Sequence, residues 1–300
     1  WLDILNPKTV PDRIKRPAPK PPVSARPRKF SATEIDMWIN DPYALYAKKI
    51  LQLRQLDDID RPPDAALRGT LFHNVLADFT RTFPSGSLPD DAYDKLLAIG
   101  KAHFADQWAM PDIRYFWWPR FEMIAGWIIE TEKQRRDALD YIYAEKKGTT
   151  TLTGLAGPVE LSARADRLEK TKDGTWHIID YKTGVAPSKR KVADGRATQL
   201  LVEALIAWDG GYDDKAGCDI AKMQYWKLSG RKGKIGDIND VLPDKGTPEN
   251  TRAMMQALIT LYDNPETAYP AEPNIKYKLP YNPYRHLARI LEWQQEGSDE

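Results

Sequence analysis

The chain has 300 residues, 42% of them hydrophobic, which is enough to bury a sizeable core in one large domain or two small ones. Its 44 basic and 43 acidic residues nearly cancel, so binding of nucleic acid through a general basic field is excluded. No run of about 18 apolar residues is present, so neither a membrane span nor a membrane partner is predicted. A single cysteine, Cys218, excludes an internal disulfide and favours a reducing, cytoplasmic location.

The first 30 residues differ from the rest in composition. They combine many prolines with a clear excess of lysine and arginine, so residues 1–30 are predicted to form an extended arm or an interdomain linker, wrapped on the body or on a partner. A plain tether and a phosphate-binding arm both fit this composition. The chain opens at Trp1 without a methionine or a secretory pattern, which is expected of a processed chain or a fragment of a longer protein.

Residues 31–145 are predicted to be the mainly helical part of a domain that covers 31–300. Ser31 and Glu34 have the spacing of a capping box, and an apolar stripe of helical period follows them. Asp41 is predicted to cap a second helix with Pro42 at its first position.

A third helix is predicted to follow Gly69, with Thr70 as its cap and His73 at the margin of its apolar stripe. A histidine in that place is either a packed, hydrogen-bonded residue or a ligand. Helical patterns then continue from Asp90 to Asp140, with many tryptophan and phenylalanine residues. These aromatic residues are interpreted as core, and stacking of nucleobases on a few of them is the alternative.

Residues 146–230 are predicted to form a sheet core. Strands are predicted at Thr149–Thr153, Pro158–Glu169, Thr175–Gly184 and 220–229, with a helix capped by Thr198 before the last of them. Residues 231–300 are predicted to form a loop, a helix at Pro248–Tyr262 and a last helix at Tyr284–Gln294. The order of helices, three strands, helix and strand indicates an α/β fold in which a mixed sheet is flanked by helices.

Charged side chains fall together at the ends of two of these strands. Asp180 and Lys182 share one face of their strand, because side chains alternate with a period of two. Residues 170–174 contain a glycine and suit a hairpin, and an odd-length loop centred near Asp173 would place Asp166 across from Asp180. Opposed carboxylates destabilise a sheet, and Mg²⁺ or Mn²⁺ between them would remove the conflict. The alternative is a strand end that runs into solvent.

Four motifs follow one another along the chain: Gly69-Thr-Leu-Phe-His73, Arg164-Ala-Asp166-Arg167, Ile179-Asp-Tyr-Lys-Thr-Gly184 and Gln199-Leu. In this succession the chain resembles the RecB-like branch of the PD-(D/E)XK nucleases, which implies a restriction-endonuclease-like fold. The segment Asp41-Pro-Tyr and the ending Tyr284–Trp293 are similar to the carboxy-terminal nuclease domain of the proteobacterial AddB subunit of helicase-nuclease complexes. The resemblance covers nearly the whole chain after residue 30.

The resemblance implies a set of ligands for Mg²⁺ or Mn²⁺: His73, Asp166, Asp180 and the main-chain carbonyl of Tyr181. Lys182 would orient the attacking water or stabilise charge that builds on the phosphate, and Gln199 would position Lys182 or the phosphate. Contacts to DNA are expected from Arg164, Arg167 and Thr183, although the two arginines could equally form structural ion pairs.

Two departures from the resemblance matter. AddB proteins of the Gram-positive type hold an iron-sulfur cluster on four cysteines, and no such cluster is expected here because Cys218 is alone. Related nuclease domains often place a tyrosine near the glutamine, whereas the fourth residue after Gln199 is Glu203.

The resemblance implies a metal-dependent DNA nuclease, exonucleolytic on single strands, that acts with an AddA-like helicase-nuclease subunit in double-strand-break repair by recombination. The chain lacks the Gly-x4-Gly-Lys-Ser/Thr element, and Gly230-Arg-Lys-Gly-Lys does not match it, so motor activity is expected to lie elsewhere. One alternative is a catalytically silent module that binds DNA or a partner. Another is a domain that cuts only when a motor feeds it a strand.

Overall fold

The structure is a computed structural model that describes residues 15–56, 62–212, 218–244, 246–274, 278–279 and 281–294. The chain divides into two compact units. The larger contains Arg28–Asp36 and Leu56–Leu261, and the smaller contains Trp1–Pro27, Met37–Gln55 and Tyr262–Glu300. No helix among the described residues is long and apolar enough to span a bilayer.

The larger unit is built on a six-stranded sheet in the order β1-β3-β4-β5-β6, with β2 also paired to β3. The strands are β1 (Lys29–Ser31), β2 (Leu139–Leu152), β3 (Val159–Thr171), β4 (Trp176–Lys182), β5 (Ile220–Arg231) and β6 (Lys234–Asp240). β1 runs parallel to β3 and β4 parallel to β5, whereas the remaining pairs are antiparallel. This mixed sheet confirms the predicted α/β class.

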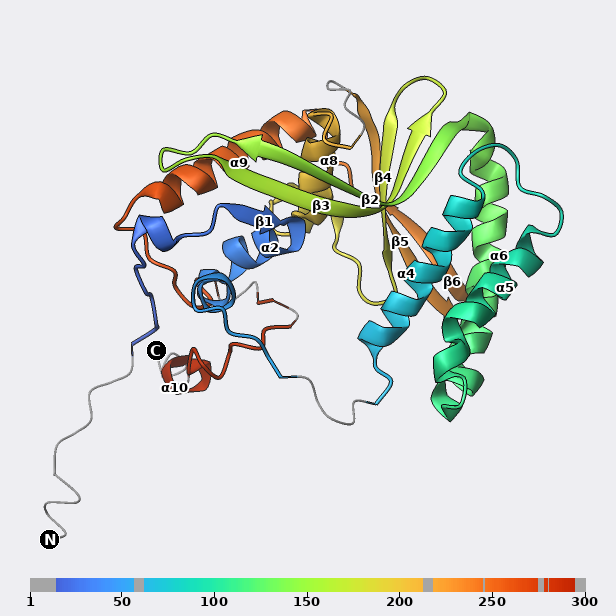
Figure 1. Ribbon diagram of the computed structural model, residues 1–300, viewed down its shortest axis with the longest axis horizontal. Helices are drawn as coiled ribbons and strands as arrows, with labels where there is room; N and C mark the ends of the chain where they lie inside the picture. The colour runs from blue at the N-terminus through green and yellow to red at the C-terminus, as the bar shows by residue number, and fades with distance from the viewer. Residues whose placement is uncertain are drawn as a thin grey trace, which may run out of the picture. The chain divides into compact units, whose positions relative to one another are not determined.

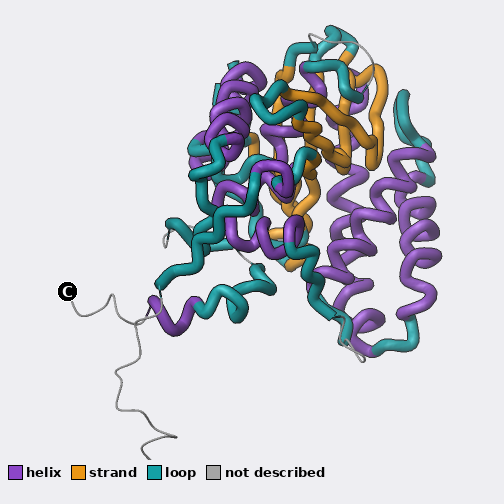
Figure 2. Tube along the Cα trace, turned by 60° about the vertical axis from the view of Figure 1, so that its left-hand side comes forward, coloured by secondary structure: helices purple, strands orange, loops and turns teal. Residues whose placement is uncertain are grey.

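Helices cover both faces of the sheet. On one face α4 (Ala65–Thr82), α5 (Ala92–Phe104) and α6 (Trp118–Arg135) pack together beside the strands (Figures 1 and 2) and share one core with Ile179 and Tyr181 of β4. Trp117, Trp118 and Phe121 are buried in this core, as the core interpretation predicted, whereas Phe116 is 60% exposed and does not belong to it. Asp180 and Lys182 alternate with Ile179 and Tyr181, so they point to the opposite face, where α8 (Gln199–Trp208) lies.

The remaining helical elements are shorter or lie outside this core. They are α2 (Ala32–Asn40), α3 (Pro42–Leu45), α7 (Lys189–Ala193), α9 (Thr247–Asp263) and α10 (Ile290–Gln294), with 3-10 turns at Val23–Ala25, Ala105–Gln107 and Arg136–Ala138 and π-helical turns at Tyr46–Ile50 and Ile113–Trp117. The capping box that begins α2 is confirmed, because the Ser31 and Glu34 side chains each accept a hydrogen bond from the other residue's N–H.

The hairpin between β3 and β4 agrees with the prediction from its sequence. Arg167 pairs with Ile179 and Lys170 with Trp176, and the chain turns at Gly174, whose φ is +89°. The next step of this register places Asp166 opposite Asp180. A glycine is favoured in the turn because side chains rarely adopt a positive φ.

The start of α4 differs from the prediction. The helix begins at Ala65 and not after Gly69, because Asp64 caps it by accepting a hydrogen bond from the Leu67 N–H at 2.8 Å. The Thr70 hydroxyl therefore lies within the helix and donates to the Ala66 carbonyl at 3.1 Å. The prediction of Thr70 as the cap was wrong.

Three other boundaries were also wrong. β2 begins at Leu139, ten residues before the predicted strand, and its whole length pairs with β3. β6 occupies Lys234–Asp240, which was predicted as loop, and it is held as an edge strand by β5. Helix α10 begins only at Ile290, because residues 283–289 form turns.

In the smaller unit, the described part of the amino-terminal segment is held by backbone bonds. The carbonyls of Pro17 and Pro19 accept hydrogen bonds from the N–H groups of Ala271 and Tyr269. Arg26 is buried, and its guanidinium donates to five main-chain carbonyls, those of Pro21, Tyr262, Asn264, Pro265 and Thr267. Arg26 therefore organises the unit and is not available to a phosphate.

Replacement of Gly148 by alanine is expected to destabilise the larger unit by about 1–3 kcal/mol. A Cβ at this position of β2 would lie 2.5 Å from the ring of Tyr212 and 2.8 Å from Ile206, and both side chains are buried. Gly184→Ala is the control, because nothing lies within 4 Å of its added Cβ. Thermal unfolding of the two variants checks this expectation, and equal melting temperatures would contradict it.

Candidate active site

Three side chains close a ring on the face of β4 that α8 covers. Asp180 is 1% exposed, and its Oδ1 accepts a hydrogen bond from Gln199 Nε2 at 2.5 Å. Its Oδ2 lies 2.8 Å from Lys182 Nζ, which in turn donates to Gln199 Oε1 at 3.1 Å. The alternation of β4 and the first turn of α8 thus hold an acid, an ammonium and an amide in mutual contact.

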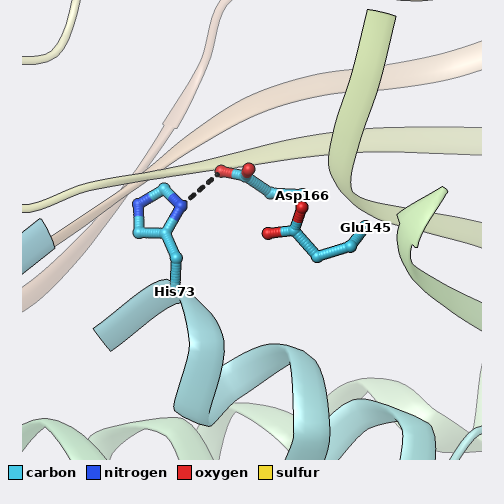
Figure 3. Close-up of side chains that lie close together, drawn as sticks. All are labelled: His73, Glu145 and Asp166. Carbon is cyan, nitrogen blue, oxygen red and sulfur yellow. Dashed lines mark ion pairs between the residues drawn. The ribbon is translucent and has the colours of Figure 1, made fainter. Parts of the chain in front are cut away.

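Asp166 comes to the same edge of the sheet from β3. Its Oδ2 accepts a hydrogen bond from the Tyr181 N–H at 2.9 Å and lies 3.2 Å from Nδ1 of His73 (Figure 3). His73 projects from α4, and its ring meets that of Tyr181 edge-on at 5.8 Å between centroids. The structure therefore places five side chains that the sequence assigned to the site on two strands, β3 and β4, and two helices, α4 and α8.

A further carboxylate, Glu145 of β2, lies against His73 and Asp166. One potential ligand atom from each of these three residues lies within 4.8 Å of the others. Glu145 falls opposite Asp166, since Ala144 pairs with Arg167 and Lys146 with Ala165. Its φ is +53°, a conformation that costs a non-glycine residue energy and that clusters at functional sites.

Sequence reasoning missed Glu145 for an identifiable reason. The strand that carries it was predicted to begin at Thr149, so nothing placed this residue beside Asp166. The available signal was the charge pattern Glu145-Lys-Lys directly before a predicted strand, and that pattern is equally typical of a solvated helix end.

Burial and mutual repulsion raise the pKa values of two carboxyl groups of the site, those of Asp180 and Glu145. Burial, partly offset by Lys182, raises the pKa of Asp180 to about 6, and Asp166 adds to the increase. The pKa of Glu145 is also raised, first by burial and then by Asp166. Burial alone would lower the pKa of His73, but its contact with Asp166 raises it overall. Negative charge is therefore collected here at an energetic cost that a cation would relieve.

Lys182 is held as a cation. Burial alone would lower its pKa, but the adjacent Asp180 carboxylate raises it overall. An ammonium of this kind cannot accept a proton near neutral pH, so Lys182 is suited to orienting groups and stabilising negative charge.

The donor atoms fit a divalent cation. Two ligand atoms that are each about 2.0–2.6 Å from one ion can be at most about 5 Å apart. The potential ligand atoms of His73, Glu145 and Asp166 meet this condition, because they all lie within 4.8 Å of one another. Carboxylate oxygens suit Mg²⁺ and Mn²⁺, and an imidazole nitrogen suits a transition-metal ion. The carboxyl group of Asp180 is not part of this group of three and is held by Gln199 and Lys182. The ligand role assigned to the Tyr181 carbonyl stays a prediction.

Arg167 does not reach a bound nucleic acid. Its side chain is 2% exposed, with Nη1 2.6 Å from Glu132 and Nη2 2.9 Å from Glu169. Of the two interpretations of this arginine, the structure supports the structural ion pair and corrects the assignment to DNA contact.

Arg164 and Thr183 lie at the site itself. Arg164 is 56% exposed and forms an ion pair with the buried Glu145 carboxylate, so it faces both solvent and the metal ligands. Thr183 follows Lys182 and lies against α4, because a Cβ added to Gly69 would be 3.4 Å from its hydroxyl.

Glu203 lies behind the ring of Asp180, Lys182 and Gln199. It is 1% exposed, and its Oε1 accepts a hydrogen bond from Gln199 Nε2 at 3.3 Å. Burial first, and then the charge of Asp180, raise the pKa of Glu203 far above its ordinary value. Glu203 therefore supports the amide of Gln199 from a buried position one helical turn further along α8.

This combination of features defines a class of protein. A mixed sheet carries an aspartate on one strand and an Asp-x-Lys pair on the next, and a flanking helix adds a histidine. Such an arrangement is typical of restriction-endonuclease-like nucleases. The model of the PD-(D/E)XK nuclease superfamily matches residues 29–293. The chain belongs to this superfamily.

Similar proteins occur in Rickettsia. The chain is 32% identical over 190 residues to an uncharacterized protein of Rickettsia conorii, and this alignment covers 62% of the chain and 23% of the relative. The chain is also 29% identical over 202 residues to an uncharacterized protein of Rickettsia typhi, and this alignment covers 66% of the chain and 23% of the relative. The match thus spans less than a quarter of the length of these curated relatives. The crystal structure of SSO0001 aligns over 77% of this chain and 78% of that one, with 10% identity and a TM-score of 0.33.

Proposed function

We propose that this chain is a metal-dependent deoxyribonuclease that hydrolyses phosphodiester bonds and degrades single strands from an end. The observation that carries the proposal is the convergence of Asp166, Asp180 and Lys182 at one sheet edge, with His73 and Glu145 completing a nitrogen and oxygen donor set. Membership of the PD-(D/E)XK superfamily supports it.

The residues divide the work by their chemistry. His73, Asp166, Glu145 and Asp180, with the main-chain carbonyl of Tyr181, would hold Mg²⁺ or Mn²⁺. When bound, such a cation supplies positive charge that screens the phosphate and lowers the pKa of the attacking water.

Lys182 remains protonated beside Asp180 and stabilises the charge that develops on the phosphate oxygens. Gln199 fixes the Lys182 ammonium through its Oε1, and Glu203 fixes the amide of Gln199. The ring therefore presents one cation in a fixed direction, which lowers the cost of reorganisation during the reaction.

The biological setting belongs to the same proposal. The motif order resembles the nuclease domain of proteobacterial AddB, which supports action with an AddA-like helicase-nuclease subunit in double-strand-break repair by recombination, in the cytoplasm. The curated relatives are about four times longer than the matched segment, which leaves room in such a protein for further domains.

The test uses the purified chain and a single-stranded oligonucleotide labelled at one end. We expect the strand to be shortened in the presence of Mg²⁺ or Mn²⁺ and to stay intact when EDTA removes the metal. Cleavage that EDTA does not affect would refute the mechanism. Titration calorimetry with Mn²⁺ serves as the second measurement, and absence of binding up to millimolar concentration would favour a catalytically silent binding module.

A further inference from the structure

A cluster of arginines from three distant parts of the chain lies beside the candidate active site. The cluster consists of Arg68 of α4, Arg120 of α6 and Arg231 at the end of β5. Burial lowers the pKa of Arg68, and the nearby positive charges of Arg120 and Arg231 lower it further. Within the described ranges, none of the three forms an ion pair with an acidic side chain. Uncompensated like charges repel one another, so their gathering favours an anionic ligand.

The hairpin between β5 and β6 adds to this cluster. Arg231 is paired directly with Lys234 across the hairpin, and Lys232 between them is exposed. Like charges directly opposite each other destabilise a sheet. Gly230, with φ +56°, brings the hairpin against α6, because a Cβ there would lie 2.7 Å from the Arg120 carbonyl oxygen. The basic run that failed to match a phosphate-binding loop is thus packed beside Arg120.

Exposed aromatic residues lie in the turn that contacts this cluster. Tyr115 and Phe116 are 64% and 60% exposed, and they lie in the π-helical turn Ile113–Trp117 that leads into α6. Arg68 lies 6.0 Å from the ring centroid of Trp117, which joins the arginine cluster to this turn. Short π-helical turns are frequent at functional sites. Large aromatic residues that are exposed on the surface are available for stacking.

The topology connects this surface to the site. β4 and β5 run parallel, and Lys182 at the end of β4 pairs with Lys227 of β5. Arg231 follows Lys227 by four residues, so it lies beyond the same, carboxyl end of these strands. Gly69, the residue after Arg68, lies against Thr183. Arg68 is five residues before His73 on α4, which is about 7–8 Å along the helix axis. The cations therefore begin one to two helical turns from the presumed metal ligands.

We infer that Arg68, Arg120, Arg231, Lys232 and Lys234, with Tyr115 and Phe116, form a binding track for single-stranded nucleic acid that leads to the active site. The cations follow the phosphate backbone, and the two aromatic rings stack on unpaired bases. A duplex keeps its bases stacked on one another, so this surface selects single strands. The inference rests on the proposed nuclease function for its purpose, but its binding test does not depend on cleavage.

The test measures fluorescence anisotropy of labelled oligonucleotides with the full chain in EDTA, so that no cleavage occurs. The probes are a 20-nucleotide DNA strand, the same sequence as duplex DNA, and the corresponding RNA strand. We expect the single strands to bind at least about 10-fold more tightly than the duplex, since stacking is worth roughly 1–3 kcal/mol per base. The DNA and RNA probes show which sugar the track prefers. Binding of the duplex as tight as that of either strand would overturn the proposal.

Two variants test the parts of the track separately. Tyr115→Ala with Phe116→Ala is expected to weaken single-strand binding by about 10-fold or more and to leave duplex binding nearly unchanged. Arg231→Gln with Lys232→Gln is expected to reduce the salt dependence of single-strand binding, the slope of log K against log salt, by about 1.4. Both pairs of residues are exposed in the native fold, and melting temperatures verify that the variants are folded.

The matched control removes two cations from the other hairpin. Lys170→Gln with Lys172→Gln changes the β3–β4 connection, at the opposite end of β4 from Lys182, and is expected to leave the slope unchanged. An equal loss of slope in this control would show a general charge effect and overturn the track. If the chain binds single strands as expected but does not cleave them in Mg²⁺ or Mn²⁺, the nuclease proposal alone is refuted. If the chain cleaves single strands and both track variants bind them as tightly as the wild type, the track alone is refuted.

Discussion

Replacement of Asp166 by asparagine is expected to lower nuclease activity by about 10²–10³-fold or more. Asp166 is the carboxylate that contacts His73, meets Glu145 and accepts the Tyr181 N–H, so it joins all the elements of the candidate metal site. Asparagine keeps the size of the side chain but removes its charge. Initial rates on a single-stranded substrate in Mn²⁺ measure the effect, and calorimetry measures the expected loss of Mn²⁺ affinity.

Asp78→Asn is the control that α4 itself offers. Asp78 also contacts a histidine, with 2.7 Å between its Oδ2 and His103 Nε2, but its side chain is 44% exposed and lies outside the site. The same chemical change there is expected to alter activity less than about 2-fold. If Asp166→Asn retained activity close to that of Asp78→Asn, Asp166 would not be a catalytic ligand and the nuclease proposal would lose its central residue.

The convergence of the site followed from simple rules of strand geometry. A period of two placed Asp180 and Lys182 on one face, and an odd-length hairpin loop centred near Asp173 placed Asp166 opposite Asp180. Both rules act over a few residues, so the sequence alone was sufficient. The histidine needed the family resemblance, because the stripe of α4 by itself does not distinguish a ligand from a packed residue.

Features that depend on partners distant in the chain were not predictable in the same way. β6 is an edge strand that contains Gly236, Asp237, Asn239 and Asp240, residue types depleted in strands, and it forms because β5 supplies its hydrogen bonds. Glu145 reaches the site only because the long β2 pairs with β3 and adopts a positive φ at that residue. Arg167 was assigned to DNA because its sequence position does not reveal that α6 places Glu132 against it.

Arg167→Met is expected to destabilise the protein by about 3–5 kcal/mol, which corresponds to a fall of roughly 10 °C in melting temperature. Arg167 lies between the fully buried carboxylates Glu132 and Glu169, and methionine retains much of its volume but none of its charge. The loss arises because buried carboxylates are left with fewer positive partners. Thermal and urea unfolding measure it. Lys133→Met, which removes an exposed ion pair with Glu130, is expected to cost about 1 kcal/mol or less.

The pH dependence of this loss distinguishes electrostatics from packing. Burial alone would raise the pKa of Glu169, but Arg167, with His177 and Arg135, lowers it to about 2. A carboxyl group with a depressed pKa in the folded state stabilises the protein above its ordinary pKa of 4.5, and this contribution is lost as the pH falls from 4.5 toward 2. The stability difference between wild type and Arg167→Met is therefore expected to be constant from pH 7 to about pH 5 and to shrink below it. A difference that stays the same down to pH 3 would mean that packing, and not the ion pairs, accounts for the cost.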